Sequence, residues 1–346
     1  SAPEIKLPGE NFNTVLYTGT GSELAVTGVG FQPDLTIIRA RQLAYNNRAF
    51  DSVRGVTKEL YTNTSGAEVT DTESLKSFDS DGFTLGDSSG VNPSSSSNMV
   101  SWNWYAPTSV SGSTVSSGTA KTYSGKANAD AGFSITKYVG NGTNYHWVPH
   151  SLGVTPECAI VRKYGGGASE QWPVLAWSFT SDIYQTFKLD NNAAQANAGA
   201  GGATNAAPDS TYVKFGLDDY VNSNGVDMLM YCFASIEGYS KVGSYTGNSN
   251  TDGSFIYTGF SPGFVILKTI NGTGNWNTLD NKRDPYNVVK DYIYLNATDV
   301  NTPATSLDFL SNGFKLRIND SYWNDSSYEY LYIAFAESPF KTSNAR

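Results

Sequence analysis

The stretch Tyr245-Thr-Gly-Asn-Ser-Asn-Thr-Asp-Gly-Ser-Phe-Ile-Tyr-Thr-Gly-Phe-Ser-Pro-Gly-Phe-Val-Ile-Leu267 decides the fold, because variants of it occur three times in the chain. A tight turn, a strand, a second turn ending in proline and a second strand recur at a long period. The N-terminal copy holds Tyr17-Thr-Gly-Thr-Gly21 and, after Pro33, Leu35-Thr-Ile-Ile38. The middle copy holds Tyr138-Val-Gly-Asn-Gly142 and, after Pro156, Cys158-Ala-Ile-Val161. Recurrence at this spacing indicates an internal repeat rather than a catalytic motif.

The composition is that of a protein built from strands and turns. The 346 residues include 22 Tyr, 17 Phe and 34 Gly, and only 16% are charged, against roughly 25% in a typical soluble domain. The net charge is −9 and no long basic stretch is present, which disfavours binding to nucleic acid through its phosphates. No apolar run approaches the roughly 18 residues of a membrane span, so we expect no membrane insertion.

The strand pattern predicts an all-β fold of three tandem antiparallel β-sandwich modules, jelly-roll or lectin-like, of about 100 residues each. Each strand alternates apolar and polar residues, which predicts one face on a core and one in water. The expected divisions are a linker at 1–11, a first module at 12–106, a Ser/Thr/Gly linker at 107–131, a second module at 132–240 and a third at 241–346.

The last apolar strand of each module predicts a central core strand, with its large residues on one face. These pairs are Trp102 and Trp104, Tyr231 and Phe233, and Ile333 and Phe335. The second module also carries an insertion from Asn191 to Pro208 that is nearly all Asn, Ala and Gly. Such a segment has few apolar residues to hold it, so we expect a flexible surface loop.

The cysteines and histidines do not form a recognisable site. Cys158 and Cys232 fall at strand positions and predict buried free thiols rather than a disulfide. His146 and His150 have a spacing that suits a metal on a helix, but Pro149 argues against a helix there. We expect no metal site, no cofactor and no catalytic triad.

Acidic residues recur in two patterns. Asp51 with Arg54, and Asp280 with Arg283, occupy matching positions in the first and third repeats, which predicts a structural ion pair or a contact between modules. Asp-rich turns are what turn chemistry prefers, with calcium binding and glycoside hydrolysis as alternatives. These turns are at Asp79-Ser-Asp81, Asp218-Asp219 and Asn319-Asp-Ser-Tyr-Trp-Asn-Asp325.

Aromatic residues in polar loops are the expected ligand-binding residues. Flat aromatic rings stack on sugar faces while neighbouring amides and carboxylates bond to hydroxyls, and the same residues serve protein-binding loops. The other interpretation is core packing or contact between modules. The candidates are Trp172, Trp276, Tyr286, Tyr322 and Trp323.

Four longer motifs carry a resemblance to a known family. The motifs are Leu7-Pro-Gly-Glu-Asn-Phe-Asn-Thr-Val-Leu-Tyr-Thr-Gly-Thr-Gly21, Asn275-Trp-Asn-Thr-Leu-Asp-Asn-Lys-Arg-Asp-Pro-Tyr286, Phe309-Leu-Ser-Asn-Gly-Phe-Lys-Leu-Arg317 and Tyr332-Ile-Ala-Phe-Ala-Glu-Ser-Pro-Phe-Lys341. Together they resemble a repeat found in structural proteins of marine bacteriophages. In that family the Leu-Pro-Gly-Glu segment often follows a SPRY or concanavalin-like lectin domain, which agrees with a linker at 1–11.

The resemblance implies a non-enzymatic virion protein, a tail-fibre or spike-like segment on the virion surface. Its implied role is host attachment, its implied partners are a host-surface glycan or receptor and other virion proteins, and its implied assembly is a homotrimer. A capsid-decorating protein and a polysaccharide-degrading enzyme on a lectin-like sandwich are the alternatives. The enzyme would need a cleft holding two carboxylates roughly 5 to 9 Å apart beside tryptophan.

Overall fold

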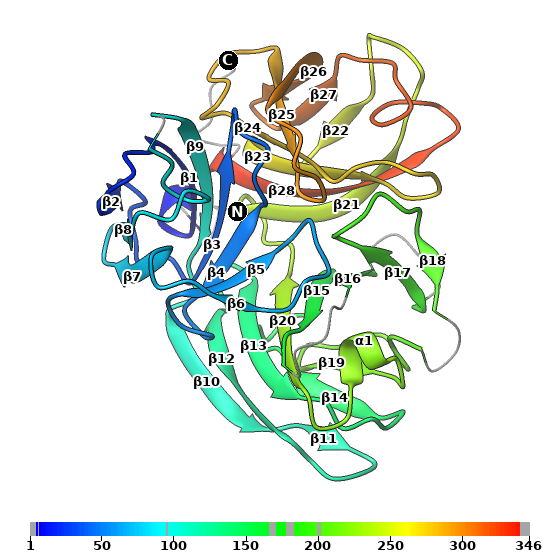
Figure 1. The fold of residues 1–346 in the computed structure, drawn as a ribbon. Coiled ribbons are helices and arrows are strands. Elements are labelled where there is room, and N and C mark those ends of the chain that lie inside the picture. Colours follow the sequence, from blue (N-terminus) through cyan, green and yellow to red (C-terminus); the bar gives the residue numbers. More distant parts are fainter. Residues whose placement is uncertain are drawn as a thin grey trace.

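The computed structural model describes residue 5 and residues 7–94, 96–165, 171–177, 183–198 and 202–339. These residues form antiparallel strands joined by turns, with a 3-10 turn η1 (Pro8–Glu10) and a single helical turn α1 (Asp219–Asn222). The expected all-β class is confirmed. In Figure 1 the blue, green and yellow-to-red parts of the chain form three groups of strands around a common centre.

Each group is one repeat, with a large sheet and a short outer layer. The first repeat (12–104) has the sheet order β1 (Phe12–Thr18), β9 (Asn98–Trp104), β3 (Leu35–Ala40), β4 (Arg48–Asp51), β5 (Lys58–Tyr61), β6 (Val69–Thr70). Its outer layer is β2 (Leu24–Thr27), β8 (Gly82–Leu85) and β7 (Leu75–Asp79).

The second repeat (108–233) follows the same plan with two extra strands, β10 and β12, at one end of its large sheet. Its sheet order is β10 (Thr108–Ser113), β12 (Thr122–Asn128), β13 (Phe133–Val139), β20 (Asp227–Phe233), β15 (Cys158–Lys163), β16 (Pro173–Ala176), β17 (Gln185–Lys188), β18 (Ala196–Asn197). Its outer layer is β11 (Val115–Ser116), β14 (His146–Pro149) and β19 (Tyr212–Phe215).

The third repeat (240–339) continues its sheet directly into the outer layer. The order is β21 (Ser240–Thr246), β28 (Glu329–Pro339), β23 (Phe260–Thr269), β24 (Asn277–Asp280), β25 (Val289–Tyr294), β26 (Thr302–Leu310), β27 (Gly313–Leu316), β22 (Phe255–Tyr257). In each repeat the last long strand (β9, β20 or β28) lies between two strands and pairs with both. One is the first strand of the repeat, and the other is the strand that follows or contains the motif proline. The predicted central strands are therefore confirmed.

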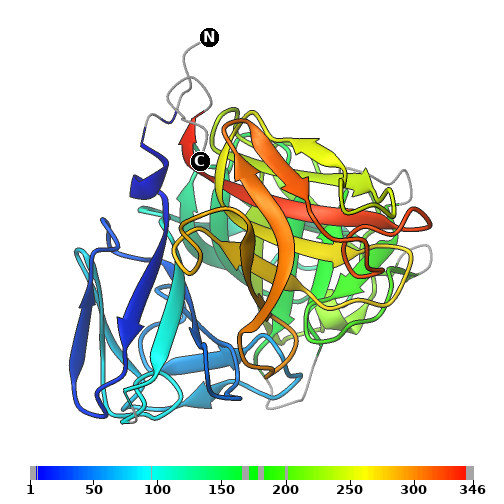
Figure 2. The same ribbon diagram turned by 90° about the horizontal axis from the view of Figure 1, so that it is seen from above.

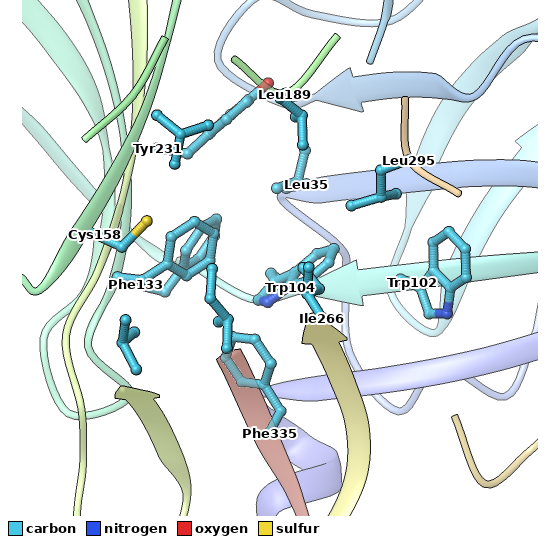
Figure 3. Close-up of a cluster of buried hydrophobic side chains, with 14 of the residues drawn as sticks. Leu35, Trp102, Trp104, Phe133, Cys158, Leu189, Tyr231, Ile266, Leu295 and Phe335 are labelled. Carbon is cyan, nitrogen blue, oxygen red and sulfur yellow. The ribbon is translucent and has the colours of Figure 1, made fainter. Parts of the chain in front are cut away.

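The inner faces of the three large sheets meet in one shared core. Trp104, Phe233 and Phe335 hold the same register position in β9, β20 and β28, opposite Leu35, Cys158 and Phe264. Their ring centroids lie 5.8 to 6.4 Å from one another, so one aromatic side chain from each repeat closes a triangle. Figure 3 shows two of the three, Trp104 and Phe335, within the shared core. Burying each such ring stabilises the fold by about 1.5–3 kcal/mol.

The opposite face of each large sheet packs on a separate core within its own repeat. Phe83 and Leu85 lie in that core of the first repeat, Val213 and Phe215 in the second, and Phe314 and Leu316 in the third. The central strands are thus buried on both faces. The expectation of one face in water is wrong for these central strands, because their other face packs against the neighbouring repeats in the shared core (Figure 2). Outer strands such as β22 do keep one exposed face.

The repeated Tyr-x-Gly motif lies at the end of the first strand of each large sheet (β1, β13 and β21), where the chain leaves that sheet for the outer layer. The tyrosine hydroxyl donates to the carbonyl of the residue before a buried asparagine: Tyr17 to Val91 (2.7 Å), Tyr138 to Val221 (2.6 Å) and Tyr245 to Trp323 (2.8 Å). The amides of Asn92, Asn222 and Asn324 bond the backbone of the turn. A Cβ at Gly19, Gly140 or Gly247 would lie 2.4, 2.0 or 2.3 Å from the next carbonyl oxygen, at Pro93, Ser223 and Asp325. The motif therefore has a structural role, and it needs glycine because the backbone of another segment passes too close for a side chain.

The expected linker at 107–131 is instead part of the second repeat. It forms β10, β11 and β12, and β12 pairs with β13 from Tyr123 to Asn128. Its Ser, Thr and Gly residues contribute through backbone hydrogen bonds, which need no apolar side chains. Lys126 forms an ion pair with Asp34 of the first repeat at 2.7 Å.

Two other segments are more ordered than the sequence predicts. In the expected linker at 1–11, Ile5 is buried in the shared core and Pro8 is also buried, while residues 1–4 and 6 lie outside the described residues. In the 191–208 insertion, residues 199–201 lie outside them too. The remainder includes β18 and the fully buried Ala203 and Thr204. Backbone pairing and burial fix these parts, so a wholly flexible surface loop is a wrong description.

Candidate functional site

Two of the expected ligand-binding tryptophans join the repeats instead. Trp172 and Trp276 are 1% exposed and lie in the shared core. Trp172 Nε1 donates to the Tyr61 carbonyl of the first repeat at 2.9 Å, and Trp276 Nε1 donates to the Lys188 carbonyl of the second at 2.9 Å. Their ring faces are covered by protein, so neither can stack on a sugar.

Asn47 completes this arrangement and was not a sequence candidate. It stands four residues before Asp51, as Trp172 stands before Ala176 and Trp276 before Asp280. Its Nδ2 donates to the carbonyls of Tyr294 and Leu295 at 3.0 and 2.7 Å. The second repeat therefore donates to the first, the third to the second and the first to the third. We call these bonds the inter-repeat ring.

The predicted Asp–Arg pairs are confirmed, and they also contact a neighbouring repeat. Arg54 Nε lies 2.6 Å from Asp51 Oδ2, and Arg283 Nε lies 2.6 Å from Asp280 Oδ2. Asp51 additionally accepts a hydrogen bond from the Tyr231 hydroxyl of the second repeat at 2.9 Å. Asp280 accepts one from Trp102 Nε1 of the first repeat at 3.1 Å. Because each of these buried carboxylates accepts several charge-assisted hydrogen bonds, both aspartates have a structural role.

The junction of the second and third repeats differs at both members of this contact. Ala176 takes the position of the two aspartates by its register with Cys158. Ile333 takes the position of Tyr231 and Trp102 in the third repeat. The donor and the acceptor are thus replaced together by apolar residues, which leaves no buried polar group unpaired at this junction.

A buried cation lies at one end of the shared core in each repeat. Arg39, Arg162 and Lys268 stand four residues after Leu35, Cys158 and Phe264 and are fully buried. Arg39 Nη2 donates to the Asp299 carbonyl at 2.5 Å, and Arg162 donates to the carbonyls of Ser65 and Gly66. Lys268 Nζ donates to the Thr269 carbonyl at 2.9 Å, and burial lowers its pKa to about 8. The sequence did carry a signal for these buried cations, because a basic residue stands at the same position in all three repeats.

The other three aromatic candidates divide between core and surface. Trp323 is 2% exposed and packs edge-on against Tyr292 in the core of the third repeat. Tyr322 is 51% exposed and Tyr286 is 82% exposed. Of the five candidates, these two alone present their rings to solvent.

The histidines and cysteines are structural. His146 donates through Nδ1 to Asn222 Oδ1 at 2.7 Å and accepts at Nε2 from the Thr114 hydroxyl at 2.9 Å. Burial lowers its pKa to about 4, and burial also lowers the pKa of His150. Cys158 faces the shared core and Cys232 the separate core of the second repeat, and both thiols are free. Burial raises the pKa of both thiols.

The carboxylates of the Asp79-Ser-Asp81 turn are used within the fold. Asp81 accepts from the amides of Gly28 and Gly30, which lowers its pKa, and Asp79 accepts from the hydroxyls of Ser77 and Thr84. Among the described residues, no three His, Cys, Asp or Glu side chains form a group that would hold a metal ion. Nor does a helix in this part of the chain have the length and apolar character that crossing a membrane requires.

Among the described residues a small cavity lies in the core and open hollows lie at the surface. The cavity lies in the shared core between the repeats and measures about 30 Å³, which is room for about one water molecule. Three open hollows measure about 370, 190 and 190 Å³. Their described lining residues include one carboxylate each, Asp227, Glu337 and Asp218 respectively, and no tryptophan.

The comparisons with known proteins give a family and no function. A family model described as a domain of unknown function (DUF7483) matches residues 7–339. No curated protein matches the chain. No solved structure matches it either.

Proposed function

The chain belongs to this family of domains of unknown function, and we propose that it is a non-enzymatic attachment protein of a phage virion. In this proposal it is a tail-fibre or spike-like body on the virion surface, and it binds a glycan or an outer-membrane protein of the host. The resemblance of its repeats to phage structural proteins motivates the virion location. The structure supports the non-enzymatic part.

The observation that carries this part is the use of the charged and aromatic residues within the fold. Asp51 and Asp280 are buried in ion pairs, and Trp172 and Trp276 join the repeats. A glycoside hydrolase needs two carboxylates in one cleft, roughly 5 to 9 Å apart. The described residues that line the three open hollows include one carboxylate each, which favours binding over hydrolysis.

The apolar faces also bear on assembly. Each repeat has the apolar stripe that would mediate a trimer, but these stripes meet within one chain in the shared core. A homotrimer would use other surfaces. Light scattering on the purified chain separates a 37.3 kDa monomer from a body of three times that mass.

Binding and location need separate tests. Applied to an array of neutral, amino- and uronic-acid-containing oligosaccharides, the intact chain should bind a subset and leave every bound oligosaccharide uncleaved. Release of shorter products would overturn the non-enzymatic proposal. Gold-labelled antibody against the chain should decorate the tail or the capsid exterior of a phage that encodes it, and unlabelled virions would remove the proposed location.

A further inference from the structure

The largest of the three open hollows lies on the second repeat, beside a strand that the other repeats lack. Its volume of about 370 Å³ falls in the range of roughly 300–1,000 Å³ that is usual for small-molecule sites. It covers the ends of β12, β13 and β20. In the first and third repeats the strands equivalent to β13, which are β1 and β21, are sheet edges with no counterpart of β12. We call this feature the β12 hollow.

Strand register places the polar side chains of the hollow on one face. Ser124 pairs with Lys137, and Val139 pairs with Asp227. Ile135 lies two residues from Lys137 on β13, and Leu229 lies two residues from Asp227 on β20. Both are fully buried in the shared core. Since side chains alternate along a strand, Lys137 and Asp227 continue that inner face beyond the end of the apolar core.

The two charged groups of the hollow are not used by the fold. Neither the Lys137 ammonium nor the Asp227 carboxylate makes a hydrogen bond or ion pair with any residue that the structure describes. Other lysines of the second repeat do pair: Lys126 with Asp34, Lys163 with Asp219 and Lys214 with Asp209. Lys137 and Asp227 thus keep their hydrogen-bonding capacity for a ligand.

The same positions are closed in the other repeats. In the third repeat, register places Ser244 and Glu329 where the second has Lys137 and Asp227, and the Ser244 hydroxyl donates to Glu329 Oε1 at 2.7 Å. In the first repeat the position of Lys137 is Leu16. The open pair of charges is therefore specific to the second repeat.

Tyr164 and Val139 add apolar surface to the hollow. Tyr164 packs partly against the shared core, and its backbone amide donates to the Asp227 carbonyl at 3.1 Å. This bond fixes the tyrosine next to the strand that carries the carboxylate. A rigid aromatic beside hydroxyl, ammonium and carboxylate groups is the combination that binds a sugar, whose carbon faces are apolar and whose hydroxyls both donate and accept.

We propose that the β12 hollow is a saccharide-binding subsite, in which Asp227 accepts hydrogen bonds from sugar hydroxyls and Lys137 donates to sugar oxygens. This inference rests on the proposed attachment function and names the place where a host glycan is held. Ser124 and Thr122 supply further hydroxyls at the rim.

The test begins with the intact chain on the oligosaccharide array described above, followed by titration calorimetry with the oligosaccharide it binds most tightly. The variants are Asp227→Asn and Lys137→Met. Each loses one charge-assisted hydrogen bond, which should weaken binding by about 10- to 100-fold. Lys290→Met, an exposed lysine on β25 of the third repeat, is the matched control and should bind as the unmodified chain does.

The outcomes separate the subsite from the attachment function. Weaker binding by both β12-hollow variants, with an unchanged control and unchanged thermal unfolding, supports the subsite. Full binding by both variants overturns the subsite and leaves glycan attachment standing. Binding of no oligosaccharide by the unmodified chain overturns the subsite and removes the glycan from the proposed function.

Discussion

The hydrogen bond from Tyr231 to Asp51 offers a sharp test of how the repeats are joined. Tyr231 lies in β20 of the second repeat, and Asp51 ends β4 of the first. The variant Tyr231→Phe removes one hydroxyl and keeps the ring that fills the shared core. Asp51 would keep its bonds from Arg54 Nε at 2.6 Å and from the amides of Val53 and Arg54 at 3.2 and 2.8 Å.

The expected cost follows from the charge of the acceptor. A hydrogen bond to a charged group contributes about 1.5–3 kcal/mol to stability, and both residues are at most 3% exposed, so water cannot replace it. With about 2.1 cal/mol/K of unfolding entropy per residue over 346 residues, this loss lowers the unfolding temperature by about 2 to 4 °C. Urea titration and a thermal scan of the same sample measure both quantities.

Tyr239→Phe is the matched control. Tyr239 is fully buried in the same shared core, but its hydroxyl has no hydrogen-bond partner among the described residues. Removing that hydroxyl should leave stability unchanged or raise it, since an unsatisfied polar group leaves the interior. Equal effects of the two variants, or a neutral Tyr231→Phe, would refute the view that this bond joins the first and second repeats.

Three further changes test the ring and the buried ionisable groups. Trp276→Ala should cost about 3–5 kcal/mol in urea unfolding, because it opens a cavity in the shared core and removes the bond to the Lys188 carbonyl; a loss below about 1 kcal/mol, usual for surface sites, would contradict its placement. Burial lowers the pKa of Lys268 to about 8, so between about pH 8 and 10.5 the unfolded chain holds a proton that the folded chain has lost. The free energy of unfolding therefore rises with pH in this window, and Lys268→Met should abolish that rise. A rise of the same size in the variant would show that Lys268 is not its source. His146→Gln should flatten the loss of stability as the pH falls from about 6.5 to 4, since burial lowers the pKa of His146 to about 4 and the unfolded chain takes up the proton first. This loss of stability amounts to at most about 3 kcal/mol. If the variant loses the same stability between about pH 6.5 and 4, groups other than His146 cause the loss.

The repeat and its strands were predictable because they depend on local pattern. Alternation identified the central strands, and the recurrence of Tyr-x-Gly identified where each repeat begins. The pairing of Asp51 with Arg54 was predictable because both residues lie in one short turn. These features need no knowledge of how the repeats are arranged in space.

The arrangement of the repeats was not predictable in this way, since alternation shows which face is apolar but not what covers it. Trp172 and Trp276 stand in polar surroundings in the sequence, and their counterpart is Asn47, so no shared aromatic marked the position. The segment 107–131 has the small residues of a linker, yet it pairs through its backbone. The buried cations at Arg39, Arg162 and Lys268 had a usable signal, because each interrupts an apolar strand at the same place.

The candidate site was predictable only in kind. The sequence favoured exposed aromatics, and Tyr286 and Tyr322 remain exposed. The β12 hollow escaped notice because Lys137 and Asp227 lie 90 positions apart and meet on one face only through the pairing of β13 with β20. Differences between repeats became informative once the register showed which positions correspond.

Scanning calorimetry of the intact chain tests the central claim, that the three repeats unfold as one body. Because they share a core and the inter-repeat ring, the account predicts a single transition whose calorimetric and van't Hoff enthalpies agree. Three tandem modules that fold independently would instead give separate transitions or a calorimetric enthalpy about three times the van't Hoff value, and that result would contradict the account.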